Sequence, residues 1–314
     1  MADKKFAVFG AGGVGGYFAA ALTRAGCPVA LIARGRHLDA IRRDGLQIES
    51  PKEAFTVNLE QVTDRPQDVG PVDAVILAVK TWQVKEAAGA IRPMLSPSAK
   101  VLPLQNGVEA PEQLEAVLGR QHVLVGLCRL ISSVVAPGHI RHAGLEPMIA
   151  LGEPGDGPLT ANAAALASAL KAAGMQVQTP ANIQAALWEK LLFIAGVSGV
   201  GAVTRSAIGE FRDCSPTRSL LQQIMEEVAA VARSRGVELT ADVVTRTLGF
   251  VDSLPPTGTA SMQRDIAEGR PSELAAIIGA VVRFGERSGV ATPVANYVYA
   301  SLLPQETRAR RIAK

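Results

Sequence analysis

Residues 6–16 read Phe-Ala-Val-Phe-Gly-Ala-Gly-Gly-Val-Gly-Gly, and this stretch decides the fold of the N-terminal half. A short apolar run ends in Gly10-x-Gly12-x-x-Gly15, and an alanine-rich stretch of helical character follows over residues 14–25. In such a strand–turn–helix unit the first glycine allows the tight turn, the second leaves room for a pyrophosphate, and the third lets the helix pack close to the strand. Since helix N-terminal N–H groups then face the anion, we expect a dinucleotide site. It comprises Gly10, Ala11, Gly12, Gly13, Val14 and Gly15.

The segment 28–34, which holds the second predicted strand, ends in a basic residue. Folds that prefer NAD usually carry Asp or Glu there, whereas this chain has Arg34 and no acid before Asp39. A guanidinium forks onto a phosphate dianion and can stack on adenine, so Arg34 favours NADP over NAD. The alternative is that this segment is only a solvated basic loop.

Length, composition and charge narrow the class of protein. The 314 residues are enough for two domains, and the net charge of +3 is too small and scattered to indicate nucleic-acid binding. We interpret the basic stretch 308–314 as a frayed, solvated end. Because the first strand follows Met1 almost directly and no apolar run reaches about 18 residues, we expect a cytoplasmic protein with no membrane segment.

Cysteines and histidines show no metal or disulfide spacing. Cys27, Cys128 and Cys214 are odd in number and far apart, which argues against a disulfide framework. His139 and His142 lie three apart in a predicted strand and would point to opposite faces. We therefore expect a reaction without a metal ion.

The predicted secondary structure changes character near residue 180. Before that point strand and helix patterns alternate, which is typical of βαβ units with a mainly parallel sheet, and after it no convincing strand remains. We predict an α/β domain of Rossmann type over residues 1–180 and an all-helical domain over residues 181–314, with the active site between them. The expected strands are 5–9, 29–33, 55–59, 74–79, 101–104 and 123–130, with shorter ones near 139–142, 148–151 and 175–178. The expected helices are 14–25, 35–44, 83–94, 110–118, 160–173, 181–200, 216–235, 241–251, 259–268, 272–288 and 293–303.

Polar residues stand at three positions where the pattern is otherwise apolar. Lys80 and Asn106 each follow a buried strand, at the carboxyl ends where α/β sheets bind ligands. Lys190 interrupts an apolar segment of the first helix after residue 180, so it either reaches the surface or faces the cleft. The alternative for the first two is an ordinary polar strand end.

A fourth group of polar residues lies in 261–273. Ser261 and Asp265 share one helical face at i, i+4, and Gly269 ends that helix. Ser272 can cap the next helix, with Glu273 in its first turn. Capping and surface charge are the alternative explanation, and the stronger one for Glu273 taken alone.

Together these residues resemble the ketopantoate reductase (2-dehydropantoate 2-reductase) family over nearly the whole chain. The resemblance implies a Rossmann-type domain followed by a helical domain like that of 6-phosphogluconate dehydrogenase. It also implies NADPH-dependent reduction of a small 2-oxo acid, and a homodimer. Its markers are the glycine turn, Ala33-Arg34-Gly35, Val79-Lys80-Thr-Trp-Gln83, Gln105-Asn106-Gly107-Val, Trp188-x-Lys190-Leu and Ser261-Met-x-x-Asp265-x-x-x-Gly-Arg-x-x-Glu273.

The resemblance implies a role for each cofactor-binding residue. The glycine turn and Arg34 would hold NADPH, while Lys80 and Asn106 would lie beside the nicotinamide ribose and the substrate. Glu273 matches a glutamate that approaches the cofactor across the cleft, and we count it with Lys190 as catalytic.

The resemblance implies the substrate side as well. Lys190 matches the family's catalytic lysine and Ser261 a substrate-binding serine. A lysine ammonium near the C2 oxygen stabilises the charge that builds there and can donate the proton. Lys190, Ser261 and Asn106 could also receive the substrate carboxylate.

The chain departs from the family at two substrate positions. Pantoate-making members carry asparagines four and eight residues after the catalytic lysine, where this chain has Ile194 and Ser198. Loss of a buried amide that pairs with a substrate hydroxyl weakens binding by about 10² or more in a matched site. Ketopantoate is therefore the lead substrate, and a more apolar 2-oxo acid is the main competitor.

Two further alternatives stay open. One is a hydroxyacid or opine-type dehydrogenase on the same architecture, against which the segment 261–273 argues. The other is a redox sensor that binds NADP(H) without turnover, which has no need of a lysine at position 190.

Overall fold

A computed structural model describes residues 4–155 and 157–312 of the chain. It divides into two compact units. The first comprises residues 1–105 and 110–183, and the second comprises residues 106–109 and 184–314. The short segment 106–109 lies between elements of the first unit in sequence but packs with the second, which the sequence does not predict.

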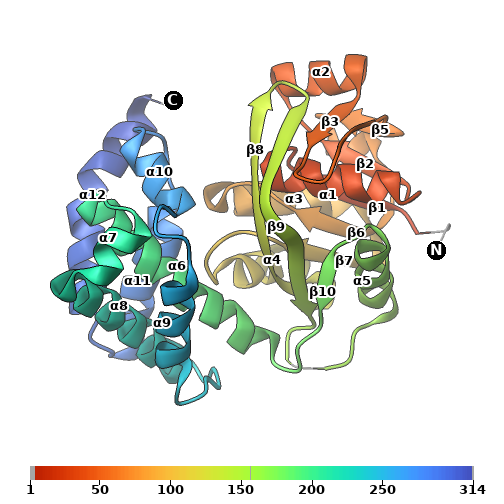
Figure 1. Cartoon of the computed structure of the whole chain (residues 1–314). Coiled ribbons are helices and arrows are strands. Elements are labelled where there is room, and N and C mark those ends of the chain that lie inside the picture. Colours follow the sequence, from red (N-terminus) through yellow and green to blue (C-terminus); the bar gives the residue numbers. More distant parts are fainter. Residues whose placement is uncertain (1–3, 156, 313–314) are drawn as a thin grey trace. The chain divides into compact units, whose positions relative to one another are not determined.

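The central sheet of the first unit is fully parallel, as the alternating pattern predicts. Its strands lie in the order β5-β2-β1-β6-β7, which places β1 in the middle (Figure 1). Every pairing in it is parallel, from Phe6 opposite Val29 to Leu77 opposite Pro103. The strands are β1 (Phe6–Phe9), β2 (Val29–Ile32), β5 (Gln61–Thr63), β6 (Val72–Leu77) and β7 (Leu95–Pro103).

The first unit also contains a second sheet. Some of its strands were predicted to belong to the parallel sheet, and others were predicted as separate short strands. The run expected at 123–130 becomes β8, which pairs antiparallel with β9. Just before β8, Val123 forms a parallel bridge to Val101 of the parallel sheet. The two short strands expected near 139–142 and 148–151 are parts of one long strand, β9. Strand β8 pairs with both parts, and the register of the pairing shifts between them. The strands are β3 (Leu46–Glu49), β4 (Ala54–Val57), β8 (Val125–Ala136), β9 (His139–Gly152) and β10 (Gln176–Gln178).

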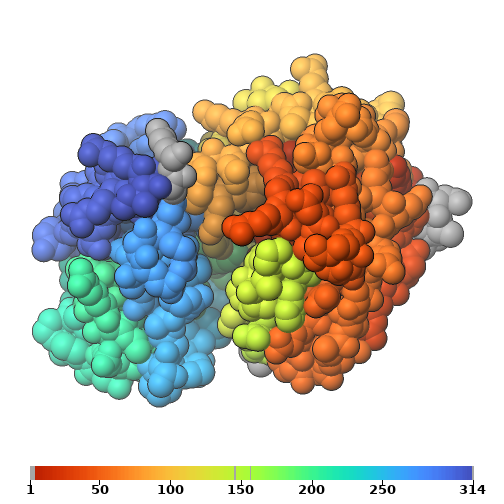
Figure 2. Space-filling model, turned by 90° about the horizontal axis from the view of Figure 1, so that it is seen from above, coloured from red at the N-terminus to blue at the C-terminus, as the bar shows by residue number. Residues whose placement is uncertain are grey.

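The tip of the β8–β9 hairpin is tied to the helix after β2. The Gly138 N–H donates to Nδ1 of His37 at 2.9 Å, and a Cβ on Gly138 would lie 3.1 Å from Ala40. Figure 2 shows this tip in yellow-green against red-orange residues of the same unit. The hairpin therefore braces the segment that follows the second strand.

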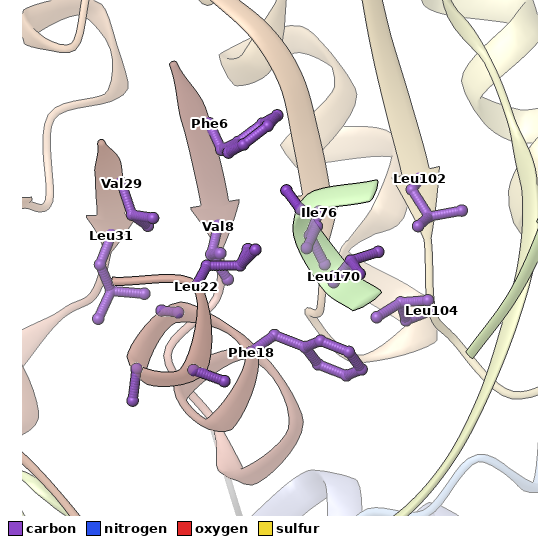
Figure 3. Close-up of a cluster of buried hydrophobic side chains, with 14 of the residues drawn as sticks. Phe6, Val8, Phe18, Leu22, Val29, Leu31, Ile76, Leu102, Leu104 and Leu170 are labelled. Atoms are coloured by element: carbon purple, nitrogen blue, oxygen red, sulfur yellow. The ribbon is translucent and has the colours of Figure 1, made fainter. Parts of the chain in front are cut away.

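Helices cover both faces of the parallel sheet. Phe6, Val8, Leu31 and Ile76 pack with Phe18 and Leu170 on one face (Figure 3). On the other face, residues such as Phe9 and Leu77 pack with α3 and α4. The helices of this unit are α1 (Gly13–Arg24), α2 (Gly35–Asp44), α3 (Val84–Ile91), α4 (Ala110–Leu118) and α5 (Ala161–Ala172), with short 3-10 turns η1 (Pro66–Asp68), η2 (Thr81–Gln83), η3 (Arg92–Met94) and η4 (Arg120–His122).

The second unit is built from helices in the part of the chain that the structure describes, as predicted. An unpredicted short helix, α7, follows the first one. The last helix continues through Pro304 to Ile312, so the expectation of a frayed tail is wrong for residues 308–312. The helices are α6 (Ile183–Thr204), α7 (Ile208–Asp213), α8 (Ser215–Ser234), α9 (Val243–Ser253), α10 (Ser261–Ala267), α11 (Leu274–Ser288) and α12 (Pro293–Ile312).

Helix α6 is apolar over most of its length. By length and composition alone it could cross a membrane, with an 18-residue window of mean hydropathy 1.5, although Glu189 and Lys190 interrupt its apolar run. The structure buries 67% of that window, however. Burial of this extent is what the core helix of a helical unit requires.

Candidate active site

The glycine turn has the geometry that its spacing predicts. Gly10 has a φ of +106°, a value that side chains disfavour, and its N–H donates to the Ile32 carbonyl at 3.1 Å. A Cβ on Gly15 would lie 1.9 Å from the Gly10 oxygen, so only glycine lets α1 pack this close to the turn. A Cβ on Gly12 would meet nothing within 4 Å. The open side of the turn is therefore a cradle at a helix N-terminus, of the kind that binds a pyrophosphate.

Arg34 is the N-cap residue of α2, two residues after the end of β2. Its side chain is 63% exposed and pairs with Glu86 at 3.6 Å, and Glu86 is 71% exposed. A pair this exposed contributes little to stability, so the guanidinium can leave Glu86 for a stronger anion. Arg34 is therefore placed to contact a phosphate group near the end of β2.

The carboxyl ends of β6 and β7 are joined by a buried amide. Gln105 donates through Nε2 to the carbonyls of Leu77 and Val79, at 2.9 and 3.0 Å. Lys80 follows directly and starts the short turn η2, with its ammonium 5.9 Å from the centre of the Trp82 ring. The Gln105 contacts fix the backbone that leads to Lys80 at this edge of the sheet.

Asn106 and Glu273 meet although 167 residues separate them. Asn106 Nδ2 donates to Glu273 Oε2 at 3.0 Å. Two further contacts hold the segment 106–109 to α11. A Cβ on Gly107 would lie 2.6 Å from the Ala276 carbonyl, and Arg283 donates to Glu109 at 2.8 Å. The Asn106 amide and the Glu273 carboxylate therefore form one polar group. The backbone next to Asn106 is held against α11, the helix that follows Glu273.

The segment 261–273 is shaped by an internal ion pair. Arg270 donates through Nε and a terminal nitrogen to Asp265 at 3.0 and 2.7 Å, and its backbone N–H bonds to the Asp265 carbonyl at 2.8 Å. Ser261, the first residue of α10, is exposed and shares that helix with Asp265, as predicted. The contacts between Asp265 and Arg270, five residues apart, give both residues of the motif in 261–273 a structural role.

The start of α11 differs from the prediction. The helix begins at Leu274, two residues later than expected, and Glu273 occupies the N-cap position rather than the first turn. Ser272 still bonds to the helix start, since its hydroxyl accepts the Leu274 N–H at 3.2 Å. The shift leaves the Glu273 carboxylate available to Asn106 instead of to the helix N-terminus.

Lys190, Ile194 and Ser198 follow one another at four-residue intervals on α6. Lys190 and Ile194 are half-buried, whereas Ser198 is 2% exposed. Leu191 and Leu192, beside Lys190, are fully buried and hold this part of the helix in the core. The three residues therefore lie on the same side of α6. Along the helix they present a charged group, then an apolar group, then a small polar group.

Some supporting residues were not found from the sequence. Arg283 and Glu109 attach the segment 106–109 to α11, and Gln105 closes the sheet edge. Of these, Gln105 stands in one of the motifs quoted above, Gln105-Asn106-Gly107-Val, but no role is predicted for it from the sequence. Among residues 4–155 and 157–312, no group of three or more His, Cys, Asp and Glu side chains could hold a metal ion.

Two family models match the chain. The one described as "Ketopantoate reductase PanE/ApbA" matches residues 6–155, and the one described as "Ketopantoate reductase PanE/ApbA C terminal" matches residues 182–306. A 2-dehydropantoate 2-reductase from Mesorhizobium japonicum is 31% identical over 94% of this chain and 96% of its own length.

Solved structures match as broadly. A PanE/ApbA family ketopantoate reductase from Ralstonia eutropha JMP134 is 33% identical, with a TM-score of 0.88 over 98% of this chain and 99% of its own. A D-mandelate dehydrogenase, solved with NADH and anilino(oxo)acetate, is 25% identical, with a TM-score of 0.86 over 98% and 99% of the two chains. Proteins of one architecture thus carry names that refer to different substrates.

Proposed function

The chain belongs to the ketopantoate reductase family, and we propose that it reduces a 2-oxo acid with NADPH, with ketopantoate, which would yield pantoate, as the lead substrate. The observation that carries this proposal is the contact between Asn106 and Glu273, which joins two motifs of the family in one polar group. The direct test is oxidation of NADPH by the purified protein in the presence of a panel of 2-oxo acids.

We assign the cofactor to the glycine turn and to the residues after the neighbouring strands. The open space at Gly12 fits a pyrophosphate, and the exposed guanidinium of Arg34 fits the 2′-phosphate that distinguishes NADPH from NADH. Lys80, Asn106 and Glu273 complete the assignment on the nicotinamide side. Residues 1–180 would then be the NADP-binding domain and residues 181–314 the substrate and dimerisation domain.

In the proposed reaction, Lys190 serves the substrate oxygen. NADPH, when bound, supplies the hydride. Reduction at C2 places negative charge on the carbonyl oxygen, and the Lys190 ammonium stabilises that charge and donates a proton to it. Asn106 and Ser261 hydrogen-bond the substrate and orient it, and Glu273 orients Asn106 through the bond at 3.0 Å.

The substrate is the part of the proposal with a real competitor. Ile194 offers no hydrogen bond to a substrate hydroxyl, and Ser198 offers a shorter side chain than asparagine. A structural neighbour with the same architecture is named D-mandelate dehydrogenase. These two observations favour an apolar 2-oxo acid as the alternative substrate.

We also propose a cytoplasmic homodimer. The family resemblance recommends the dimer, and sedimentation of the purified protein would test it. The burial of 67% of the apolar window of α6 supports a location away from the membrane.

Arg34→Ala is expected to raise the KM for NADPH about tenfold and to leave the KM for NADH nearly unchanged, because only NADPH carries the 2′-phosphate. Steady-state kinetics with both cofactors checks this. Arg43→Ala is the matched control, since Arg43 is an exposed arginine at the other end of α2 and pairs with Asp44. A wild-type preference for NADH would show that Arg34 was misinterpreted.

Two glycines of the turn are expected to respond differently to alanine. Gly15→Ala should destabilise the fold by about 1–3 kcal/mol, because its Cβ would lie 1.9 Å from a backbone oxygen. Gly12→Ala should leave the unfolding temperature unchanged, since its Cβ meets nothing, and weaken NADPH binding by crowding the pyrophosphate. Thermal unfolding and NADPH titration measure both. Unchanged NADPH affinity in Gly12→Ala would move the pyrophosphate away from this turn.

A further inference from the structure

We propose that Glu306, on the last helix, is a positioning residue for Glu273 and Asn106. This inference rests on the proposed function, because it assigns a part in that reaction to a residue outside the motifs. It starts from a buried carboxylate near the end of the chain, only 3% exposed.

The Glu306 carboxylate fixes the residue immediately before Glu273. Its two oxygens accept the Ser272 N–H at 3.2 and 3.0 Å, and Oε2 also accepts the Ser272 hydroxyl at 2.6 Å. Ser272 is fully buried. Both the backbone and the side chain of this residue are thus held by one group on another helix.

Arg310 closes the network. It pairs with Glu306 Oε1 at 2.6 Å, one turn along α12, and donates to the Ser272 carbonyl at 2.8 Å. The buried charge of Glu306 is therefore compensated, and the Ser272 peptide groups are held on both sides. Charge-assisted bonds of this kind are stronger than neutral ones and leave Ser272 little freedom.

Restraint of Ser272 by Glu306 also affects the contact between Glu273 and Asn106. Glu273 follows Ser272 directly and binds Asn106 at 3.0 Å, so a shift of Ser272 moves the acceptor of that bond. Reaction rates are sensitive to such displacements, since misplacement by about 1 Å can cost about 10²-fold. Glu306 does not need to contact cofactor or substrate to have this effect.

Glu306→Gln is the variant that isolates the effect. Glutamine has nearly the same volume, but both carboxylate oxygens of Glu306 accept hydrogen bonds, so the amide NH₂ must face a donor. The network therefore breaks while the packing of α12 is kept. Glu227→Gln is the matched control, because Glu227 accepts the N–H groups of Val294 and Ala295 at the opposite end of the same helix, both at 2.8 Å.

The test is a double-mutant cycle with Glu273→Gln, read as kcat/KM for NADPH and as the Kd of NADPH. We expect Glu306→Gln to lower kcat/KM about tenfold, and the double variant to match Glu273→Gln within about twofold. Glu227→Gln should stay within about twofold of wild type even where its unfolding temperature falls.

Three results would overturn the inference. In the first, the losses of the two single variants multiply in the double variant. In the second, Glu306→Gln behaves like Glu227→Gln. In the third, Glu273→Gln changes neither measured quantity. A wild-type protein that binds NADPH but reduces no 2-oxo acid would refute the proposed function alone, and the cycle would then be decided on the Kd of NADPH.

Discussion

Lys190→Ala is expected to lower kcat by at least about 10² while the affinity for NADPH stays near the wild-type value. The ammonium serves the substrate oxygen, where charge develops only as the reaction proceeds, so its loss removes an interaction made in the transition state. Stopped-flow or steady-state turnover, together with NADPH titration, separates the two quantities.

Glu189→Gln is the control for damage to α6. Glu189 precedes Lys190 and pairs with Arg246 at 2.9 Å on the exposed side of the helix. Its substitution perturbs the same turn of α6 but keeps the Lys190 ammonium. Turnover of Lys190→Ala equal to wild type would remove Lys190 from the mechanism. A parallel loss of NADPH affinity would make its role structural. Absence of turnover in the wild type, with NADPH still bound, would favour the redox-sensor alternative.

Ile194→Asn is expected to shift specificity towards ketopantoate by about 10², measured as the ratio of its kcat/KM to that of an apolar 2-oxo acid. An amide at this position would pair with the substrate hydroxyl, and a site with such a partner rejects substrates that lack the hydroxyl. The side chain is half-buried, and asparagine is smaller than isoleucine, so the substitution fits.

Two companion variants make this test decisive. Ile194→Val keeps the site apolar and should leave the ratio within about threefold of wild type. Adding Ser198→Asn supplies the second family amide, but Ser198 is 2% exposed, so unfolding temperature must be measured alongside. An unchanged ratio in Ile194→Asn would show that position 194 does not contact the substrate hydroxyl.

The sequence predicted the elements that are held together by local patterns. The β1–α1–β2 unit follows from an apolar strand, a glycine turn and a helical stretch that are adjacent in the chain. Strand β5, three residues long, is too short to show a period. The sequence predicts strand β9 as two pieces, and Gly144 and Pro147 lie between them, where the pairing with β8 shifts register. The last helix is predicted to end at Leu303, immediately before Pro304, but α12 continues past that proline to Ile312.

The residues proposed for the site could be singled out from the sequence, but the contacts between them could not. Lys80, Asn106 and Lys190 stood out because each is polar where the pattern is apolar. The bond from Asn106 to Glu273 joins residues 167 apart, and no periodicity encodes such a distance. Glu306 was not predicted, because it is a charged residue among other charged and polar residues and does not stand out from its surroundings. Its segment is charged, which reads as solvated surface, whereas the structure buries the carboxylate against Ser272.

The most direct test of the proposed function is oxidation of NADPH by the purified protein, followed by its absorbance, with ketopantoate and a panel of other 2-oxo acids. We expect turnover on at least one 2-oxo acid, faster with NADPH than with NADH. Fastest turnover on ketopantoate would establish the lead substrate, and fastest turnover on an apolar 2-oxo acid would establish the alternative. Binding of NADPH with no oxidation by any 2-oxo acid would contradict the proposed function.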